Sequence, residues 1–111
     1  MSRCFQAKFP IKPEDIKDEA CSNSKKLDQK ATVRYCGRIT YLEGNSKGKQ
    51  IYDCFAEGDV KGEFNFSKTI QETLTCENIT SQSYKKGEVE FCACSSDVCN
   101  GGLSSKVNKE S

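Results

Sequence analysis

Eight cysteines are the residues of this chain whose number and spacing could do chemistry. Cysteines either pair as disulfides or bind a metal such as zinc as thiolates. The chain has no histidine and no Cys-x-x-Cys pair, and its cysteines are too dispersed for one or two compact tetrahedral zinc sites. We therefore expect disulfides and no metal, zinc being the alternative interpretation. The cysteines stand at positions 4, 21, 36, 54, 76, 92, 94 and 99.

Other catalytic side chains are scarce in this sequence. Without histidine, a serine or cysteine nucleophile has no ordinary general base. The carboxylate pairs Asp15 with Asp18 and Glu88 with Glu90 lie in polar runs, where we expect solvated side chains rather than a glycosidase-type pair. There is no glycine-rich phosphate-binding loop. These observations predict a protein that is not an enzyme and that uses no cofactor.

The composition indicates a thin core that disulfides must support. The chain has 111 residues, of which 35% are hydrophobic and 30% charged, and it contains no Trp. Burying so little apolar surface would barely offset the entropy that is lost when the chain becomes ordered. Because disulfides form in oxidising compartments, we expect an extracellular protein, either secreted or at the cell surface.

The charge balance argues against two classes of partner. The 17 basic and 16 acidic residues are interleaved and leave a net charge of +1. The sequence therefore lacks the basic surface of a protein that binds nucleic acid or lies on a membrane. No run of about 18 apolar residues could span a bilayer. We expect contact with a membrane only through an anchor outside this sequence, such as a GPI anchor or a transmembrane segment.

A chain of this length is expected to form one domain, over residues 4–100. Residues 1–3 lie before it and lack the apolar region of a signal peptide, so we expect that Met1 stands where a signal peptide was removed. Residues 101–111 are small and polar, and we expect a flexible tail there.

The elements that must position the cysteines centre on a hairpin in the middle of the chain. Residues 31–41 alternate between apolar and polar side chains with the period of a half-buried strand. Residues 42–49 contain turn formers, and residues 50–55 return as a second strand. Cys36 and Cys54 would lie near the base of this hairpin.

The segment before this hairpin is expected to form a first loop. Residues 5–10 are a strand candidate. Residues 11–19 follow Pro10, contain Pro13 and are rich in charged side chains, so they predict a loop, in which Pro13 could open a single helical turn. Residues 22–30 are polar and predict a connector.

The segment after the hairpin is expected to form a third loop. Residues 56–66 contain glycines and an asparagine that favour a loop. A capping box predicts one or two helical turns over residues 69–74. A polar stretch over residues 77–87 then leads into an alternating strand at residues 88–92.

The last two cysteines carry a resemblance to a known superfamily. The segment Cys94-Ser95-Ser96-Asp97-Val98-Cys99-Asn100 resembles the C-terminal motif of three-finger domains, as does the order of cysteine spacings from Cys4 onward. This superfamily includes snake neurotoxins, lymphocyte-antigen-six/urokinase-receptor (LU) proteins and the ectodomains of activin and other TGF-β-type receptors. The resemblance implies a small all-β, disulfide-rich three-finger fold with antiparallel hairpins radiating from a four-disulfide hub.

The same resemblance implies a disulfide pairing and a role for Asn100, whereas the cysteine count alone leaves 105 pairings open. In the superfamily the asparagine amide ties the loops together beside the hub. Adjacent cysteines are usual where this chain has an intervening Ala93, so we expect a small bulge there. The extra cysteine pair common near the first cysteine of LU proteins is absent. The implied disulfides are Cys4–Cys36, Cys21–Cys54, Cys76–Cys92 and Cys94–Cys99.

Two tripeptides, Asn65-Phe66-Ser67 and Asn78-Ile79-Thr80, match the N-glycosylation sequon. In a secreted chain we expect glycan on Asn65, on Asn78 or on both, because both asparagines lie in segments that we expect to form loops. Sugar there would cover the side of the third loop and leave other surfaces for a partner.

Binding to another protein is the function that remains. Recognition falls on loops held by a rigid scaffold, and the middle hairpin is the best candidate. Alternatively, half of its aromatic side chains only pack between fingers. Arg34 and Arg38 could anchor an acidic partner or lie in water. The predicted partner-binding residues are Tyr35, Arg38, Ile39, Tyr41, Leu42, Glu43, Tyr52 and Phe55.

Three functions follow from the resemblance. The first is an LU-type extracellular module, secreted or membrane-anchored, that recognises an extracellular or cell-surface protein through its finger loops. The second is the ligand-binding ectodomain of an activin or TGF-β-type receptor, which the long middle hairpin would also suit. The third is a toxin-like modulator of a receptor or ion channel. Such toxins carry Trp and Arg near the central tip, and residues 42–49 have neither.

Overall fold

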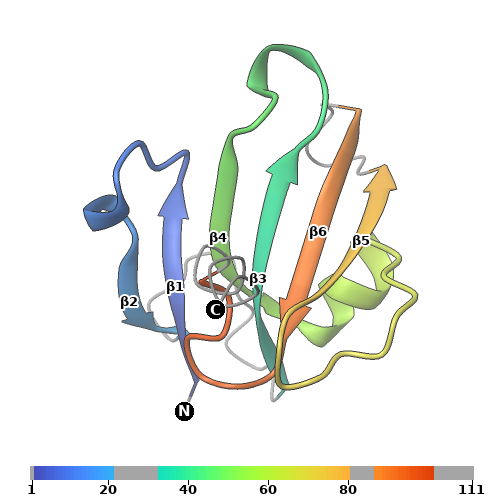
Figure 1. Cartoon of the computed structure of the whole chain (residues 1–111). Helices are drawn as coiled ribbons and strands as arrows, with labels where there is room; N and C mark the ends of the chain where they lie inside the picture. The colour runs from blue at the N-terminus through green and yellow to red at the C-terminus, as the bar shows by residue number, and fades with distance from the viewer. Residues whose placement is uncertain (1, 22–32, 81–86, 102–111) are drawn as a thin grey trace, which may run out of the picture.

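The structure, a computed structural model, describes residues 2–21, 33–80 and 87–101. In this part of the chain six antiparallel strands form a sheet in the order β2-β1-β4-β3-β6-β5, and consecutive strands pair as three hairpins (Figure 1). We call these hairpins the first finger (β1–β2), the middle finger (β3–β4) and the third finger (β5–β6). Four disulfides lie at the base of the sheet: two join the first hairpin to the middle hairpin, one lies within the β5–β6 hairpin, and one closes a ring after β6. The fold is therefore small, all-β and disulfide-rich, as predicted. The strands are β1 (Arg3–Lys8), β2 (Lys17–Ala20), β3 (Arg34–Tyr41), β4 (Gln50–Ala56), β5 (Thr75–Thr80) and β6 (Glu88–Cys94).

The hairpin predicted in the middle of the chain is confirmed, because β3 and β4 pair along their whole length. The short helical turn η3 (Gly44–Ser46) lies at its tip. Gly44 and Gly48 have φ angles of 77° and 90°, a region that glycine occupies without steric cost. Residues 31 and 32, where the first strand was expected to begin, lie outside the described residues.

The core lies on one face of the three central strands, under residues 56–66. This segment was predicted to be a loop, and the prediction is wrong because it contains the short π-helix η4 (Asp59–Glu63). Its glycines suggested turns, but its apolar side chains bury themselves on the sheet. Phe64 stacks on Phe91 with ring centroids 4.3 Å apart. The buried core comprises Ile39, Tyr41, Ile51, Phe55, Val60, Phe64, Phe66, Val89, Phe91 and Ala93.

The helix predicted over residues 69–74 is absent, and this segment has no regular structure. Its backbone carbonyls accept hydrogen bonds from the segment between Cys94 and Cys99 and not from a following helical turn. The Gln71 carbonyl accepts a hydrogen bond from the Ser95 backbone N–H at 2.9 Å, and the Glu72 carbonyl accepts one from the Ser96 hydroxyl at 2.7 Å. Contacts distant in sequence therefore outweigh the local capping signal.

The first finger contains more strand than the sequence indicated. Part of the predicted loop at residues 11–19 is β2, which pairs with β1. The helical turn that Pro13 could open is present as η1 (Pro13–Asp15). The charged side chains of β2 gave no apolar alternation, so its pairing with β1 was not apparent. The predicted connector at residues 22–30 lies outside the described residues.

The third finger also contains a strand that the sequence did not reveal. The polar stretch predicted over residues 77–87 includes most of β5, which pairs with β6 at one edge of the sheet. No side chain of β5 is fully buried and most are polar, so the alternation that reveals a half-buried strand is weak there. Residues 81–86 lie outside the described residues.

The bulge predicted at Ala93 is absent. Ala93 lies opposite Gly37 of β3 and Thr75 of β5, with regular pairing on either side of it. Its buried side chain packs in the core. Because side chains alternate along a strand, Cys92 and Cys94 both point to the face of the sheet opposite to that of Ala93.

Candidate functional site

The disulfide hub is the rigid base from which any binding surface projects. Its four disulfides are the same four pairs that the resemblance implied, and no cysteine is free. Cys4–Cys36 and Cys21–Cys54 join the first finger to the middle finger, while Cys76–Cys92 lies within the third finger. The Cys94–Cys99 ring follows β6.

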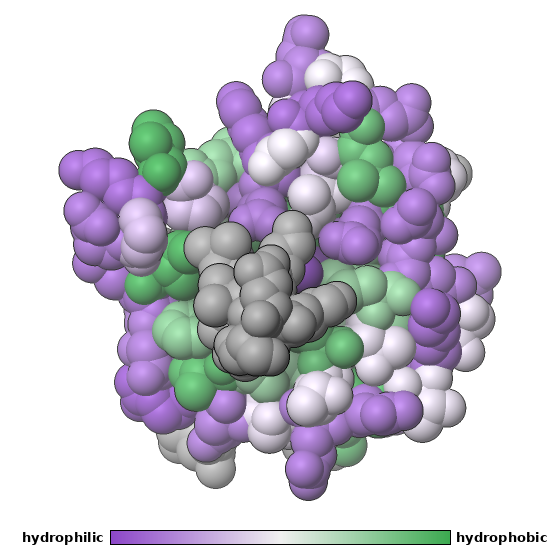
Figure 2. All heavy atoms as spheres, viewed as in Figure 1, coloured by the Kyte–Doolittle hydropathy of each residue, from purple (hydrophilic) through white to green (hydrophobic). Residues whose placement is uncertain are grey.

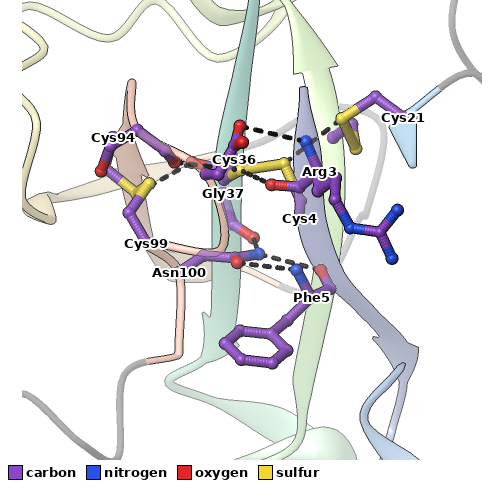
Figure 3. The surroundings of a disulfide bond; sticks show 12 residues. Arg3, Cys4, Phe5, Cys21, Cys36, Gly37, Cys94, Cys99 and Asn100 are labelled. Atoms are coloured by element: carbon purple, nitrogen blue, oxygen red, sulfur yellow. Dashed lines mark hydrogen bonds between the residues drawn. A yellow bond between two sulfur atoms is a disulfide. The ribbon is translucent and has the colours of Figure 1, made fainter. Parts of the chain in front are cut away.

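Asn100 fastens this ring to two strands (Figure 3). Its side chain is fully buried. The amide oxygen accepts a hydrogen bond from the Phe5 N–H at 3.0 Å, and the amide nitrogen donates to the carbonyls of Phe5 at 3.0 Å and Gly37 at 2.8 Å. Asn100 therefore ties β1, β3 and the end of the domain together.

Most of the predicted partner-binding residues are inside the molecule. The middle hairpin lies at the centre of the sheet, between neighbouring strands, and most of its side chains are buried. These residues therefore pack between the fingers, which is the alternative interpretation of the aromatic side chains, and they do not line a surface. The buried residues of that set are Arg38, Ile39, Tyr41, Tyr52 and Phe55.

Arg38 neither lies in water nor presents its charge to a partner. Its side chain is buried, and an Nη atom donates to the Cys92 sulfur at 3.5 Å. Burial raises the pKa of Tyr52, and the nearby Arg38 guanidinium offsets part of that rise. Within the described residues the Nε atoms of Arg34 and Arg38 are buried without a hydrogen-bond partner.

Tyr35, Leu42 and Glu43 are the members of the predicted set that remain accessible. Burial, and after it the carboxylate of Glu57, raise the pKa of Tyr35. The Glu43 carboxylate accepts a hydrogen bond from the Glu88 N–H at 2.7 Å, and the Leu42 N–H donates to the Glu88 carbonyl at 3.1 Å. The tip of the middle finger is therefore fastened to the third finger.

Among the residues that the structure describes, the most exposed large apolar side chain is on the first finger, at Ile11, which is 91% exposed. Figure 2 shows a hydrophobic knob at the outer end of the β1–β2 hairpin, beside hydrophilic side chains. The turn that carries Ile11 is held from inside, because the Asp15 carboxylate accepts hydrogen bonds from the N–H groups of Ile11 and Lys12, both at 3.1 Å. Prolines at positions 10 and 13 restrict the backbone further.

Phe9 joins this turn to the middle finger. Its N–H donates to the Gln50 carbonyl at 2.8 Å, and its ring contacts that of Tyr41 edge-on with centroids 5.7 Å apart. Phe9 has a φ of 53°, unusual for a residue other than glycine. The ammonium groups of Lys8 and Lys49 lie 5.8 and 5.3 Å from its ring centroid. We call Lys8, Phe9, Ile11, Lys12 and Lys49 the finger-one tip surface.

The sequence held a signal for this surface that was not recognised. Ile11 is a lone apolar residue between two prolines and among charged residues, in Pro10-Ile11-Lys12-Pro13. A loop that does not pack against the core would normally carry a polar side chain at this position. The contribution of Lys49 could not be seen, since only the fold brings it beside Phe9.

Both sequon asparagines, Asn65 and Asn78, are exposed. Asn78 lies in β5 rather than in the predicted loop. The Ser67 hydroxyl of the first sequon donates to the Glu77 carboxylate at 2.6 Å, and the Ser67 N–H donates to it at 2.9 Å. These hydrogen bonds hold the pKa of Glu77 below its ordinary value.

Two groups of side chains in the described residues have the spacing of metal ligands. Cys4, Cys21 and Cys54 form one, and Cys76, Cys92 and Glu90 form the other. Every cysteine in them is in a disulfide. A disulfide sulfur is not a thiolate, so neither group presents the ligands that zinc requires.

Neither a protein-family model, nor a curated protein, nor a solved structure matches this chain. Its likeness to three-finger domains thus depends on the cysteine spacing and the Cys94–Asn100 motif. Among the residues that the structure describes, no helix has the length and apolar character needed to cross a membrane.

Proposed function

We propose that this protein is an extracellular protein-binding module of the three-finger, LU type, and that it recognises an extracellular or cell-surface protein through the finger-one tip surface. Four disulfides suit an oxidising compartment. They also hold the fingers rigidly, so that a loop can bind without a large loss of conformational entropy.

The observation that carries the proposal is the exposure of Ile11 on a turn held by Asp15. A fully exposed isoleucine on a rigid turn contributes nothing to the core, but it could fill an apolar pocket in a partner. Lys12 follows it in the chain, and the ammonium groups of Lys8 and Lys49 lie over the ring of the nearby Phe9, so a partner's pocket would be bordered by carboxylates. Leu42 and Tyr35 extend the accessible apolar surface of the middle finger.

A panel of purified extracellular receptor and ligand ectodomains, screened by surface plasmon resonance, tests this function. We expect at least one to bind, and Ile11→Ser to weaken that binding by about tenfold or more, because burying an isoleucine contributes about 1.5–3 kcal/mol. Val33→Ser is the matched control, since Val33 is 43% exposed but lies at the base of the middle finger. Equal effects of the two variants would show that the partner does not bind through the finger-one tip surface.

The extracellular location predicts glycan on Asn65, Asn78 or both, at exposed positions. Expression behind a secretory signal in mammalian cells should give a product that becomes lighter on treatment with an N-glycosidase. Asn65→Gln and Asn78→Gln would assign the sites singly. A secreted wild type of unmodified mass would contradict glycosylation and leave the binding proposal to the first experiment.

A further inference from the structure

Two disulfides of the hub lie against each other. The Cys4 sulfur, bonded to Cys36, is 3.3 Å from the Cys21 sulfur, bonded to Cys54. The sulfurs of Cys4, Cys21 and Cys54 all lie within 4.8 Å of one another. Figure 3 shows the Cys21 sulfur on the side of the Cys4 sulfur that faces away from Cys36. A thiolate attacking a disulfide approaches from that side.

The remaining two cysteines are also placed to pair. Cys36 and Cys54 are directly opposite each other in β3 and β4. In an antiparallel pair of strands, hydrogen-bonded and non-hydrogen-bonded residue pairs alternate. The Tyr41 N–H donates to the Lys49 carbonyl and the Glu57 N–H donates to the Val33 carbonyl, so these two opposed pairs are hydrogen-bonded ones. Cys36 and Cys54 then form a non-hydrogen-bonded pair, for which a Cα separation of about 4.5 Å is usual and within the range of disulfides.

The protein already contains a disulfide of this kind. Cys76 and Cys92 are directly opposite in β5 and β6, and they are bonded with a Cα separation of 4.0 Å. A bridge between directly opposed residues is therefore compatible with the twist of this sheet.

We propose that the hub can isomerise between two disulfide pairings, from Cys4–Cys36 with Cys21–Cys54 to Cys4–Cys21 with Cys36–Cys54, and that a small thiol catalyses the exchange. The observed pairing links the first finger to the middle finger through both bonds. The alternative pairing confines each bond to a single finger.

The exchange consumes no oxidant or reductant. Because the four cysteines are buried, the first step requires a local opening of the hub; a thiolate RS⁻ then attacks Cys54, forms a mixed disulfide and releases Cys21 as a thiolate. Cys21 attacks Cys4, forms the Cys4–Cys21 bond and releases Cys36 as a thiolate. Cys36 attacks Cys54, forms the second new bond and releases RS⁻. Two disulfides are broken and two are formed, and the catalyst is recovered.

The consequence is a change in how the first finger is held. Without the two bonds that link the fingers, β1 retains its ladder of Ala7 and Lys8 with β4, the contact of Phe9 with Tyr41, and its hydrogen bonds to Asn100. The finger-one tip surface contains residues of the first finger and Lys49 from the middle hairpin. The relative positions of its residues would therefore depend on which disulfides are formed. The exchange itself does not depend on any partner.

A serine variant tests the central step without an added thiol. Cys54→Ser leaves Cys21 as a free thiol beside Cys4, so we expect the free thiol to move to Cys36. After trapping with N-ethylmaleimide and digestion without reduction, mass spectrometry should find a Cys4–Cys21 peptide and label on Cys36. In the control Cys76→Ser, whose group holds no third cysteine, the label should stay on Cys92. Label on Cys21 with Cys4–Cys36 intact would overturn the proposal.

The wild type decides the matter if the variant does not fold. Incubation with a reduced and oxidised glutathione mixture at pH 8 should give a product of unchanged mass with Cys4–Cys21 and Cys36–Cys54 peptides. Recovery of the original four pairs alone, under conditions in which added reductant opens the hub, would overturn it.

Discussion

At the scale of single residues, Asn100 shows how an amide can replace regular backbone pairing. Three backbone groups, from Phe5 and Gly37, converge on it in the interior. No aliphatic side chain could satisfy them, and burial without a partner is costly for each.

We predict that Asn100→Ala lowers the free energy of unfolding by about 2–4 kcal/mol, because it leaves buried donors and acceptors unpaired. Urea unfolding of the oxidised protein measures this loss. Asn45→Ala, at an exposed position in the tip of the middle finger, is the matched control and should change stability by less than about 0.5 kcal/mol. Similar losses in both variants would contradict the role of Asn100.

Gly37 provides a second residue-scale prediction. A Cβ atom there would lie 2.7 Å from Cδ2 of Phe55 and 3.1 Å from the Cys92 carbonyl oxygen. Gly37→Ala should therefore destabilise the protein by about 1–3 kcal/mol through overpacking. Gly58→Ala meets no atom within 4 Å and should be neutral or slightly stabilising in the same urea measurement.

At the scale of elements, the strands at the edges of the sheet depend on contacts with other segments. β5 is fastened through Glu77, whose carboxylate accepts two hydrogen bonds from Ser67. Lys68 adds a hydrogen bond to the Cys76 carbonyl at 2.8 Å. These contacts order the irregular segment that leads from η4 into the third finger.

The Glu77 contact predicts a pH dependence. Because the folded-state pKa of Glu77 is lowered, its contribution to stability is present above the ordinary pKa of glutamate. The contribution is lost as the pH falls from that value through the lowered one. Wild type should therefore be more stable than Glu77→Gln at pH 7, with the difference shrinking in acid; urea unfolding at several pH values measures it. A difference that stayed constant down to pH 2 would contradict ionisation as its source.

At the scale of the whole molecule, the disulfides supply what the core does not. The bonds Cys4–Cys36 and Cys21–Cys54 connect residues 32 and 33 positions apart. In the loop-entropy model each is worth about 3.5–4 kcal/mol, so that the two together rival the stability of a small domain.

Complete reduction is therefore expected to unfold the protein at 25 °C. Circular dichroism and amide hydrogen exchange of the reduced, alkylated protein should show loss of the sheet and of amide protection. The oxidised protein in the same buffer is the control. A reduced protein that kept its protected amides would show that the core suffices alone.

The sequence by itself determined the features that depend on neighbouring residues or on composition. Alternation near Tyr35 and Ile39 predicts β3, and the thin core together with eight cysteines predicts a fold held by disulfides. The spacing from Cys94 to Asn100 carried the resemblance, and with it the disulfide pairs and the amide that ties the strands. Each of these signals lies in neighbouring residues, in the cysteine spacing or in the composition, so it is visible in the sequence alone.

Only the tertiary structure decided what lies inside. Arg38, Tyr41 and Tyr52 had the composition of a binding surface, yet they are buried because β3 and β4 lie between other strands. Phe64 belonged to a predicted loop and proved to be core, while Ile11 also belonged to a predicted loop and proved to be the most exposed of the large apolar side chains that the structure describes. Burial depends on which segments lie beside a residue in space, and that is set by strand pairing between residues far apart in the chain.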